Sequence, residues 1–375
     1  MKIIQVLPEL NSGGVERGTL EVAQRLVEEG HEALVVSAGG RMVPALEKLG
    51  ARHVAMPVHK KRLGTLLQVR PLRRLLETER PDIVHIRSRA PGWVAWLAWR
   101  KMDPLTRPRL VSTVHGFYSV NAYSAVMTRG ERVIAVSESV RAYVLDNYKR
   151  VAPARLTTIH RGVDPAAYPT GWRAPEEWRR AWAEQFPETR GKLLVTLPGR
   201  LTRWKGAEDF VEIVAELRRR GLPVHGALVG ETHPRKRAYE GELRAKIGAA
   251  GLAEHVTLTG VRSDLREIMA ESAAVLSLSL DPEAFGRTTI EALTLGRPVA
   301  GYAHGGVGEQ LAAMLPEGAV TPGDRAAMAD LLTRWLADGG TSAPRPRSNV
   351  DFTLEAMLSR TLGVYRELVS SPRGA

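Results

Sequence analysis

Residues 192–230 of the chain are KLLVTLPGRLTRWKGAEDFVEIVAELRRRGLPVHGALVG. The apolar run KLLVTLPGR is followed by a loop, then by a helical pattern through EDFVEIVAELRRRG, and then by a second apolar run, VHGALVG. Strands that alternate with helices in this way imply parallel pairing with right-handed crossovers. The stretch therefore predicts a βαβ unit of a doubly wound α/β sheet.

The same alternation occurs in two series along the chain. The first begins with KIIQVLP, NSGG and the helical pattern VERGTLEVAQRLVEEG, and the second continues from residue 192 to AVLSLSL. A Pro- and Trp-rich segment without strand character separates them. We expect two Rossmann-like doubly wound domains, residues 1–168 and 169–351, with an entry helix near 175–186 and a last helix at about 352–369.

The composition limits the class of protein and of partner. The 375 residues include 53 Lys and Arg against 41 Asp and Glu, a net charge of +12, which favours nucleic acid, anionic lipid or a phosphorylated small molecule as partner. With no cysteine, disulfides and thiolate metal sites are excluded. The N-terminus MKIIQVLPELNSGG is too short and too soon polar for a signal peptide, and no apolar run reaches the ~20 residues of a membrane span. We expect a cytoplasmic protein, with contact to the inner face of the membrane left open.

Ligands of doubly wound sheets bind beyond the carboxyl ends of the strands, so the motifs of interest lie in those loops. Gly13 and Gly14 follow the first predicted strand and open a helix, where backbone N–H groups can face a phosphate. Gly-Gly loops are also common as simple tight turns. Arg200 and Lys205, in LPGRLTRWKG, are placed to neutralise a diphosphate leaving group, although a solvated basic loop is the plainer interpretation in so basic a chain.

The stretch EAFGRTTIEAL, residues 283–293, places Glu283 in a loop and Glu291 inside the helix that follows. Glu291 could accept hydrogen bonds from a ribose diol, and Glu283 could meet a sugar beyond the diphosphate. Two surface acids near a helix start are the alternative, because acids complement the helix dipole there. His115, in STVHGFYS, follows another strand, and a lone histidine is more often structural than catalytic. HGGVGE, residues 304–309, is a further glycine-rich turn after a strand.

Together these motifs resemble those of family 4 glycosyltransferases of the GT-B fold. The resemblance runs along the full chain and in order, through GGVE, the histidine of TVHG, AVSES, IHRGVD, GRLTRWKG and PEAFGRTTIEALTLGRPVAGYAHGGVGE. The last stretch is the family's Glu-x7-Glu element with its flanks intact, and it is highly specific.

The resemblance implies two domains that face each other across a cleft, with the last helix joining the first domain, and a UDP- or GDP-sugar donor held mainly by the second domain. It implies that Arg200 and Lys205 grip the diphosphate, that Glu291 holds the ribose and that Glu283 holds the donor sugar. The remaining donor contacts that it implies are Gly13, Gly14, Val261, Arg262, Ala284, Phe285, Gly286 and Arg287. The catalytic residues that it implies are His115, Arg200, Lys205 and Glu283.

The implied chemistry is transfer of a hexose with retention at the anomeric carbon by a front-face reaction. The departing phosphate oxygen takes the acceptor proton, so catalysis is orientation plus stabilisation of the leaving diphosphate. The two glutamates are then two grips on one extended ligand, not the acid–base pair of a hydrolase. No cofactor and no metal are expected, because the chain lacks an Asp-x-Asp element and the two cations can neutralise the leaving group.

The acceptor is expected on the first domain, at Glu16, Arg87, Arg89 and His115. Arg87 and Arg89 favour an anionic saccharide or glycolipid, as in bacterial lipopolysaccharide core assembly, whereas two solvated arginines are the alternative. The basic, Leu-containing segment 59–76 could lie on an anionic leaflet, with an aromatic contribution from Trp93, Trp96 and Trp99, although a Trp stripe is more often core.

Other classes of protein remain as alternatives. A sugar-nucleotide epimerase with a GT-B-like fold is the rival enzyme, and a non-catalytic nucleotide-sugar-binding scaffold is the rival binding protein. A nucleic-acid binder would explain the charge, but no nucleic-acid module is recognisable and no nucleic-acid partner is expected. The sequence leaves open the donor base and sugar, the acceptor, the linkage and the oligomeric state.

Overall fold

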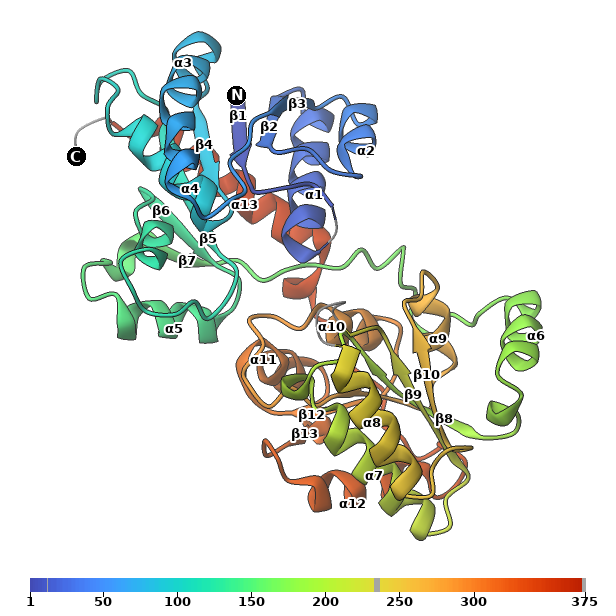
Figure 1. Cartoon of the computed structure of the whole chain (residues 1–375). Coiled ribbons are helices and arrows are strands. Elements are labelled where there is room, and N and C mark those ends of the chain that lie inside the picture. The colour runs from blue at the N-terminus through green and yellow to red at the C-terminus, as the bar shows by residue number, and fades with distance from the viewer. Residues whose placement is uncertain (12, 233–236, 373–375) are drawn as a thin grey trace. The chain divides into compact units, whose positions relative to one another are not determined.

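The structure, a computed structural model, describes residues 1–11, 13–232 and 237–372. The chain folds as two units, one of Met1–Arg161 with Glu355–Ala375 and one of Gly162–Leu354. Each unit is a parallel β-sheet with helices packed on its faces, so the predicted α/β class with two Rossmann-like units is confirmed (Figure 1). The domain ranges 1–168 and 169–351 stay a prediction.

The first unit contains a seven-stranded parallel sheet of order β3-β2-β1-β4-β5-β6-β7. Its strands are β1 (Lys2–Val6), β2 (Glu32–Ser37), β3 (Arg52–Ala55), β4 (Ile83–Ile86), β5 (Arg109–Val114), β6 (Arg132–Ala135) and β7 (Leu156–Thr158). Its helices are α1 (Gly14–Glu28), α2 (Val43–Lys48), η1 (Leu63–Gln68), α3 (Val69–Glu79), α4 (Arg89–Trp99), η2 (Ser124–Thr128), α5 (Glu138–Asn147), η3 (Pro153–Arg155) and α13 (Leu354–Ser370).

The central strands are buried along almost their whole length because helices cover both faces of the sheet. All four residues of β4 are buried, as are four of the five residues of β1. The strand order reverses between these two neighbours, and in doubly wound folds that reversal opens a crevice at the carboxyl ends. The loop with Gly13 follows β1 and Arg87 follows β4, so the fold brings both to this point.

The last helix, α13, belongs almost entirely to the first unit, although its sequence lies at the other end of the chain. The hydroxyl of Tyr365 lies 2.6 Å from Nδ1 of the buried His85, and Glu355 pairs with Arg25 on α1. Its observed start at Leu354 and end at Ser370 match the last helix that was predicted at about 352–369.

The second unit contains a six-stranded parallel sheet of order β10-β9-β8-β11-β12-β13. Its strands are β8 (Leu193–Pro198), β9 (Val224–Val229), β10 (Val256–Gly260), β11 (Ala274–Ser277), β12 (Val299–Tyr302) and β13 (Ala319–Val320). Its helices are α6 (Glu176–Gln185), η4 (Pro187–Thr189), η5 (Arg203–Lys205), α7 (Ala207–Arg219), α8 (Arg237–Ala249), α9 (Leu265–Glu271), α10 (Arg287–Thr294), α11 (Gly305–Met314), η7 (Pro316–Gly318), α12 (Arg325–Leu336) and η8 (Val350–Phe352).

The predicted entry helix at 175–186 is α6, and its tryptophans explain why the segment is ordered. Trp178 stacks on Trp182 with ring centroids 5.3 Å apart, and Trp182 packs into a core cluster with Leu194 and Ile268. Burial of aromatic rings of this size dominates local stability. The segment is thus an appendage packed against the second sheet.

Among the residues that the structure describes, no helix combines the length and the apolarity that crossing a membrane requires.

Candidate active site

In the second unit the strand order reverses between β8 and β11, and this edge brings Lys205 and Glu283 together. The Lys205 ammonium lies 2.7 Å from Oε1 of Glu283, and the same carboxylate oxygen accepts a hydrogen bond of 2.6 Å from the Ser279 hydroxyl. Both charged side chains are less than one fifth exposed. Lys205 and Glu283, which are predicted to bind the same ligand, are therefore in direct contact at the carboxyl edge of the sheet, where solvent reaches them only in part.

The turn before α7 can approach β11 because residue 206 is glycine. Gly206 has a φ of 75°, and a Cβ there would lie 2.1 Å from the carbonyl oxygen of Leu278. The backbone N–H of Leu280 donates to the carbonyl of Trp204 across the same contact, at 2.7 Å. Any side chain at position 206 would separate the loop that carries Lys205 from the loop that carries Glu283.

The loop from Glu283 to Gly286 is held by the HGGVGE motif at the start of α11. The N–H of Gly306 donates to the carbonyl of Glu283 at 2.8 Å, and a Cβ on Gly306 would lie 2.4 Å from Cα of Phe285. His304 Nε2 lies 2.7 Å from the carbonyl oxygen of Ser279. The HGGVGE motif therefore holds the loop from Glu283 to Gly286 in place. The sequence alone did not reveal this role.

Helix α10 starts directly after Gly286 and carries Glu291 inward. Glu291 is 5% exposed, and Nε of Arg287, one turn earlier, lies 3.3 Å from its Oε1. The interpretation of Glu291 as a surface acid is therefore wrong. A buried carboxylate near a helix N-terminus can accept hydrogen bonds from two adjacent hydroxyls, as a ribose diol would require.

The other predicted donor residues of this unit lie in different surroundings. Arg200 is exposed, and the structure records no ion pair or hydrogen bond for its side chain within the described part of the chain. Val261 is 66% exposed, whereas Arg262 is held by two hydrogen bonds to Asp264. The structure thus brings Lys205 and Glu283 into contact, whereas among the described residues it records no hydrogen bond or ion pair of either with Arg200, Val261 or Arg262.

In the first unit the Gly13–Gly14 loop leads into α1, and Glu16 folds back over it. A Cβ on Gly13 would lie 2.6 Å from Oε2 of Glu16, whereas a Cβ on Gly14 would have no neighbour within 4 Å. Burial raises the pKa of Glu16 above its usual value. Neither the conformation nor the packing of Gly14 requires glycine, so its backbone is left open to close approach by a ligand.

His115 lies beyond the carboxyl end of β5 and is bound by Arg161, which follows β7. Nη2 of Arg161 lies 2.6 Å from Nδ1 of His115. Burial, followed by the positive charges of Arg161 and Arg87, holds the pKa of His115 well below its ordinary value, so the ring is neutral at pH 7. Because a guanidinium only donates, Nδ1 is the acceptor and the proton sits on Nε2, which leaves one N–H to donate to a ligand.

Arg87 is 1% exposed, so the expectation of a solvated arginine at this position is wrong. Its Nη1 donates to Oε1 of Gln5 at 3.1 Å. Arg89, two residues on, is different, because its guanidinium lies 4.5 Å from the ring centroid of Tyr118 and 3.3 Å from the hydroxyl of Ser124. The two arginines that the sequence grouped together therefore occupy different environments.

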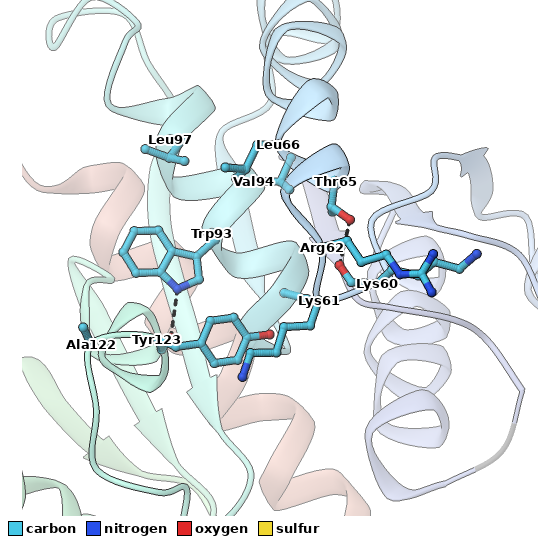
Figure 2. Close-up of a pocket in the computed structure, with 11 residues that line it drawn as sticks. Lys60, Lys61, Arg62, Thr65, Leu66, Trp93, Val94, Leu97, Ala122 and Tyr123 are labelled. Carbon is cyan, nitrogen blue, oxygen red and sulfur yellow. Dashed lines mark hydrogen bonds between the residues drawn. The ribbon is translucent and has the colours of Figure 1, made fainter.

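A pocket of about 490 Å³ opens in the first unit where residues 60–66, 90–97 and 122–123 meet (Figure 2). Trp93, Val94 and Leu97 form an apolar wall, and Nε1 of Trp93 donates to the carbonyl of Tyr123 at 2.9 Å. The lining also contains the consecutive cations Lys60, Lys61 and Arg62, and the Lys61 ammonium lies 4.5 Å from the Tyr123 ring centroid. Figure 2 shows the Arg62 side chain directed away from Trp93.

The tryptophans of α4 divide between this pocket and the core. Trp99 is buried and donates to the carbonyl of Pro108 at 2.6 Å, so its interpretation as a membrane contact is wrong. Trp93 and Trp96 are half-buried and pack edge to face with centroids 5.5 Å apart. Of the tryptophans in the basic region, Trp93 is the one that lines the pocket.

Several residues of the site were missed from the sequence. Arg161 lies inside the quoted motif IHRGVD, but nothing local predicted its contact with His115. Ser279, His304 and Gln310 support the Glu283 loop, and the Gln310 amide donates to the carbonyl of Phe285 at 2.5 Å. The glycine-rich turn after β12 is the sequence signal for His304 and Gln310, whereas no local pattern marks Ser279.

Comparison with known families matches both units. Residues 12–167 match the model of Glycosyltransferase Family 4, and residues 179–349 match that of Glycosyl transferases group 1. A similar curated protein is 2-deoxystreptamine N-acetyl-D-glucosaminyltransferase of Streptomyces fradiae, 29% identical, with 93% of this chain and 87% of that protein aligned.

Solved structures agree with this match over the whole chain. A glycosyltransferase from Rickettsia africae superposes with a TM-score of 0.85 at 27% identity, covering 99% of each chain. The Anabaena protein HepE, crystallised with UDP, superposes with a TM-score of 0.80 at 21% identity, covering 98% of this chain and 100% of that one, which indicates a shared fold.

Proposed function

The chain belongs to glycosyltransferase family 4, and we propose that it transfers a hexose, with retention of anomeric configuration and without a metal, from a UDP- or GDP-sugar to a lipid-linked or lipopolysaccharide-type saccharide. Enzymatic sugar transfer follows from the family. We propose, beyond this, the identity of the donor, the stereochemistry of the transfer, its independence of metal and the class of acceptor.

The contact between Lys205 and Glu283 is the observation that carries the proposal. Two side chains assigned to the diphosphate and to the donor sugar touch at the carboxyl edge of β8 and β11, where doubly wound folds bind nucleotides. A donor entering this edge would exchange the Lys205–Glu283 contact for two others, ammonium to diphosphate and carboxylate to sugar hydroxyls. Arg200, which follows β8, would add a second positive charge to the leaving group.

In the proposed reaction the bond between the anomeric carbon and the diphosphate oxygen breaks, and a bond to the acceptor oxygen forms on the same face of the sugar. The acceptor proton passes to the departing phosphate oxygen. Lys205 and Arg200 stabilise the charge that develops there, as preorganised donors do for other oxyanions. No protein base is required, and the neutral His115, whose Nε2 carries a proton, would donate a hydrogen bond and not accept the acceptor proton.

The acceptor side of the proposal rests on the first unit. An apolar pocket beside Lys60 and Lys61 fits a molecule with an apolar portion and an anionic group, as in a lipid-linked saccharide. The acceptor named for the Streptomyces fradiae relative, 2-deoxystreptamine, is a diamine and hence a cation, which these positive charges disfavour. We therefore propose an acceptor of the opposite charge.

We also propose a cytoplasmic location with peripheral contact to an anionic membrane. The basic segment 59–76 presents Leu67, 76% exposed, next to Leu66, 42% exposed. Flotation with vesicles containing phosphatidylglycerol should recover the protein, and vesicles of phosphatidylcholine alone should not. Replacing Lys60 and Lys61 by glutamine should abolish recovery, whereas the same change at Lys246, on α8 of the second unit, should not. Equal recovery with both vesicle types would contradict membrane contact through this segment.

The donor is tested by a thermal-shift panel of UDP-, GDP-, ADP- and CMP-sugars, each with and without EDTA. UDP-sugars are tried first because the Anabaena neighbour was crystallised with UDP. A stabilising donor is then incubated with lipopolysaccharide-core saccharides, and the anomeric configuration of the product is read by proton NMR. Retained configuration in the presence of EDTA supports the proposal. Inversion or EDTA-sensitive turnover would refute the mechanism, an epimerised donor would indicate the epimerase, and binding without turnover would indicate the scaffold.

A further inference from the structure

Resting on the proposed function, we infer that Arg87, Arg161 and His115 form a binding site for an oxyanion group, a phosphate or a carboxylate, carried by the acceptor. The site lies in the first unit, at the carboxyl ends of β4, β5 and β7, where these strands meet the first turns of α1. Arg161 and His115 are then the partners of Arg87 in contacting the anionic acceptor expected from the sequence.

The main observation is that a fully buried guanidinium has unused donors. Arg87 is 1% exposed, and its Nε and Nη2 are buried without a hydrogen-bond partner in the described part of the chain. The side-chain hydrogen bond that the described residues give it, from Nη1 to Gln5, is to a neutral amide. Buried polar groups are normally satisfied, so a guanidinium with two unpaired nitrogens points to a missing acceptor.

The charge around Arg87 is also uncompensated. No carboxylate of the described residues pairs with it, and burial lowers its pKa, while Tyr365, Glu21 and Glu16 counteract this only through longer-range charge. The adjacent His85 is neutral, because burial and the charge of Arg87 hold its pKa well below the ordinary value. Desolvated charges are costly unless they are paired, so an arriving oxyanion would be bound strongly.

A second guanidinium lies beside the first. A Cβ built on Gly18 of α1 would lie 2.9 Å from Nη1 of Arg161 and 3.1 Å from Nη2 of Arg87, so both groups surround one point. The absence of a side chain at Gly18 provides that space. Arg161 and His115 are half-buried, so they form the side by which a ligand enters, and His115 contributes its Nε2–H.

This arrangement matches the chemistry of an oxyanion. Planar guanidinium groups bind carboxylate and phosphate with pairs of parallel hydrogen bonds, which a lysine cannot reproduce. The acceptor is the favoured source because the cluster belongs to the first unit, as do the cationic pocket and Arg89, whereas Lys205 and Glu283 belong to the second.

The test uses the full-length protein, with glucose 6-phosphate and glucuronate as probes and glucose and matched NaCl as controls. The variants are Arg87→Met and Arg87→Lys. The first removes the charge at similar side-chain length, and the second keeps the charge but removes the paired N–H donors of the guanidinium. Arg100→Met is the matched control, because that arginine is exposed and lies over the Trp96 ring, at the end of the α4 segment that Arg89 begins. Melting temperatures are recorded without ligand, with each probe, and with UDP and pyrophosphate.

We expect at least one anionic probe to raise the Tm of the wild type by at least about 2 °C, and glucose and NaCl not to do so. Arg87→Met should lose this shift while its ligand-free Tm stays equal or rises, because removing an unpaired buried charge is neutral or stabilising. Arg87→Lys should retain a reduced shift, and Arg100→Met should retain it in full.

Three results would overturn the inference. Arg87→Met could lower the ligand-free Tm and leave the probe shift intact, which would make Arg87 structural. Alternatively, both anionic probes could leave the Tm of the wild type unchanged, which would mean that no oxyanion binds. Finally, Arg87→Met could abolish the shift with UDP or pyrophosphate only, which would assign the cluster to the donor. Turnover of a nucleotide sugar is measured in parallel, so failure of the proposed function is recognised separately, by the absence of donor binding and transfer.

Discussion

The ion pair between Lys205 and Glu283 gives a quantitative prediction that separates folding from catalysis. Lys205→Met removes the ammonium and leaves the Glu283 carboxylate with the Ser279 hydroxyl as its recorded partner. Breaking a fully buried pair costs about 3–5 kcal/mol, and an exposed pair is worth about 0–1 kcal/mol. Because the two side chains are 18% and 16% exposed, we expect a loss of about 1–3 kcal/mol in the free energy of unfolding.

The double variant Lys205→Met/Glu283→Gln should recover most of that stability, because the amide can keep the Ser279 hydrogen bond without a charge. Its activity should not recover. Loss of one preorganised group that stabilises a developing oxyanion lowers kcat by about 10²–10³, and Lys205 is absent from both variants. Activity would thus stay low while stability returns.

Urea denaturation measures the stabilities, and nucleotide release in the presence of acceptor measures kcat. Lys246→Met is the control, since Lys246 pairs with Glu212 at 2.6 Å on a surface where the two side chains are 33% and 40% exposed. It should cost less than about 1 kcal/mol and leave kcat unchanged. The reasoning fails if Lys205→Met is as stable as wild type, or if the double variant regains wild-type kcat.

Three further predictions follow from single residues. Gly14→Ala should leave the Tm unchanged, because a Cβ there meets nothing within 4 Å, but should raise the KM for the donor; an unchanged KM in steady-state assays would show that no ligand approaches this loop. Gly306→Ala should lower kcat and stability together, because its Cβ would lie 2.4 Å from Cα of Phe285; wild-type kcat would mean that the loop tolerates displacement. Burial lowers the pKa of His225 to about 4, below the ordinary value of 6.5, so its contribution to stability is full above pH 6.5 and is lost as the pH falls towards 4. Denaturation as a function of pH should show a loss of about 3 kcal/mol over that window that His225→Gln reduces, and an equal loss in the variant would rule out this cause.

The architecture was accessible from the sequence because alternation of apolar runs and helical patterns is local information. The runs around residues 193–198 and 274–277 needed no tertiary detail to be assigned to parallel strands, and both are strands of one sheet. These strand assignments also predict that Lys205 and Glu283 lie near each other, because neighbouring parallel strands end at the same edge of the sheet. Their direct contact does not follow, because it depends on how closely the backbone at Gly206 approaches Leu278.

Burial of charge was the property that the sequence could not supply. Arg87 and Arg89 are two residues apart in one basic motif, yet one is enclosed and the other lies over aromatic rings. The difference arises from Gly18 and Gln5, which lie on other elements and provide the space and one acceptor for Arg87. The contact of Arg161 with His115 was missed for the same reason, because β5 and β7 are separated by β6 in the sheet and no local pattern connects the loops that follow them.

The two units treat their buried cations differently, and this difference has a consequence for ligand selection. The ammonium of Lys205 is neutralised by Glu283 before any ligand arrives, so a donor must compete with an internal carboxylate, which disfavours weak anions and favours a multiply charged diphosphate. Arg87 has no such competitor among the residues that the structure describes, so a single phosphate or carboxylate suffices to compensate it. A neutral or cationic acceptor would leave that charge unpaired and would gain nothing from it. On this argument the first unit selects acceptors by charge, and the anionic probes should be distinguished from glucose even where every other contact is the same.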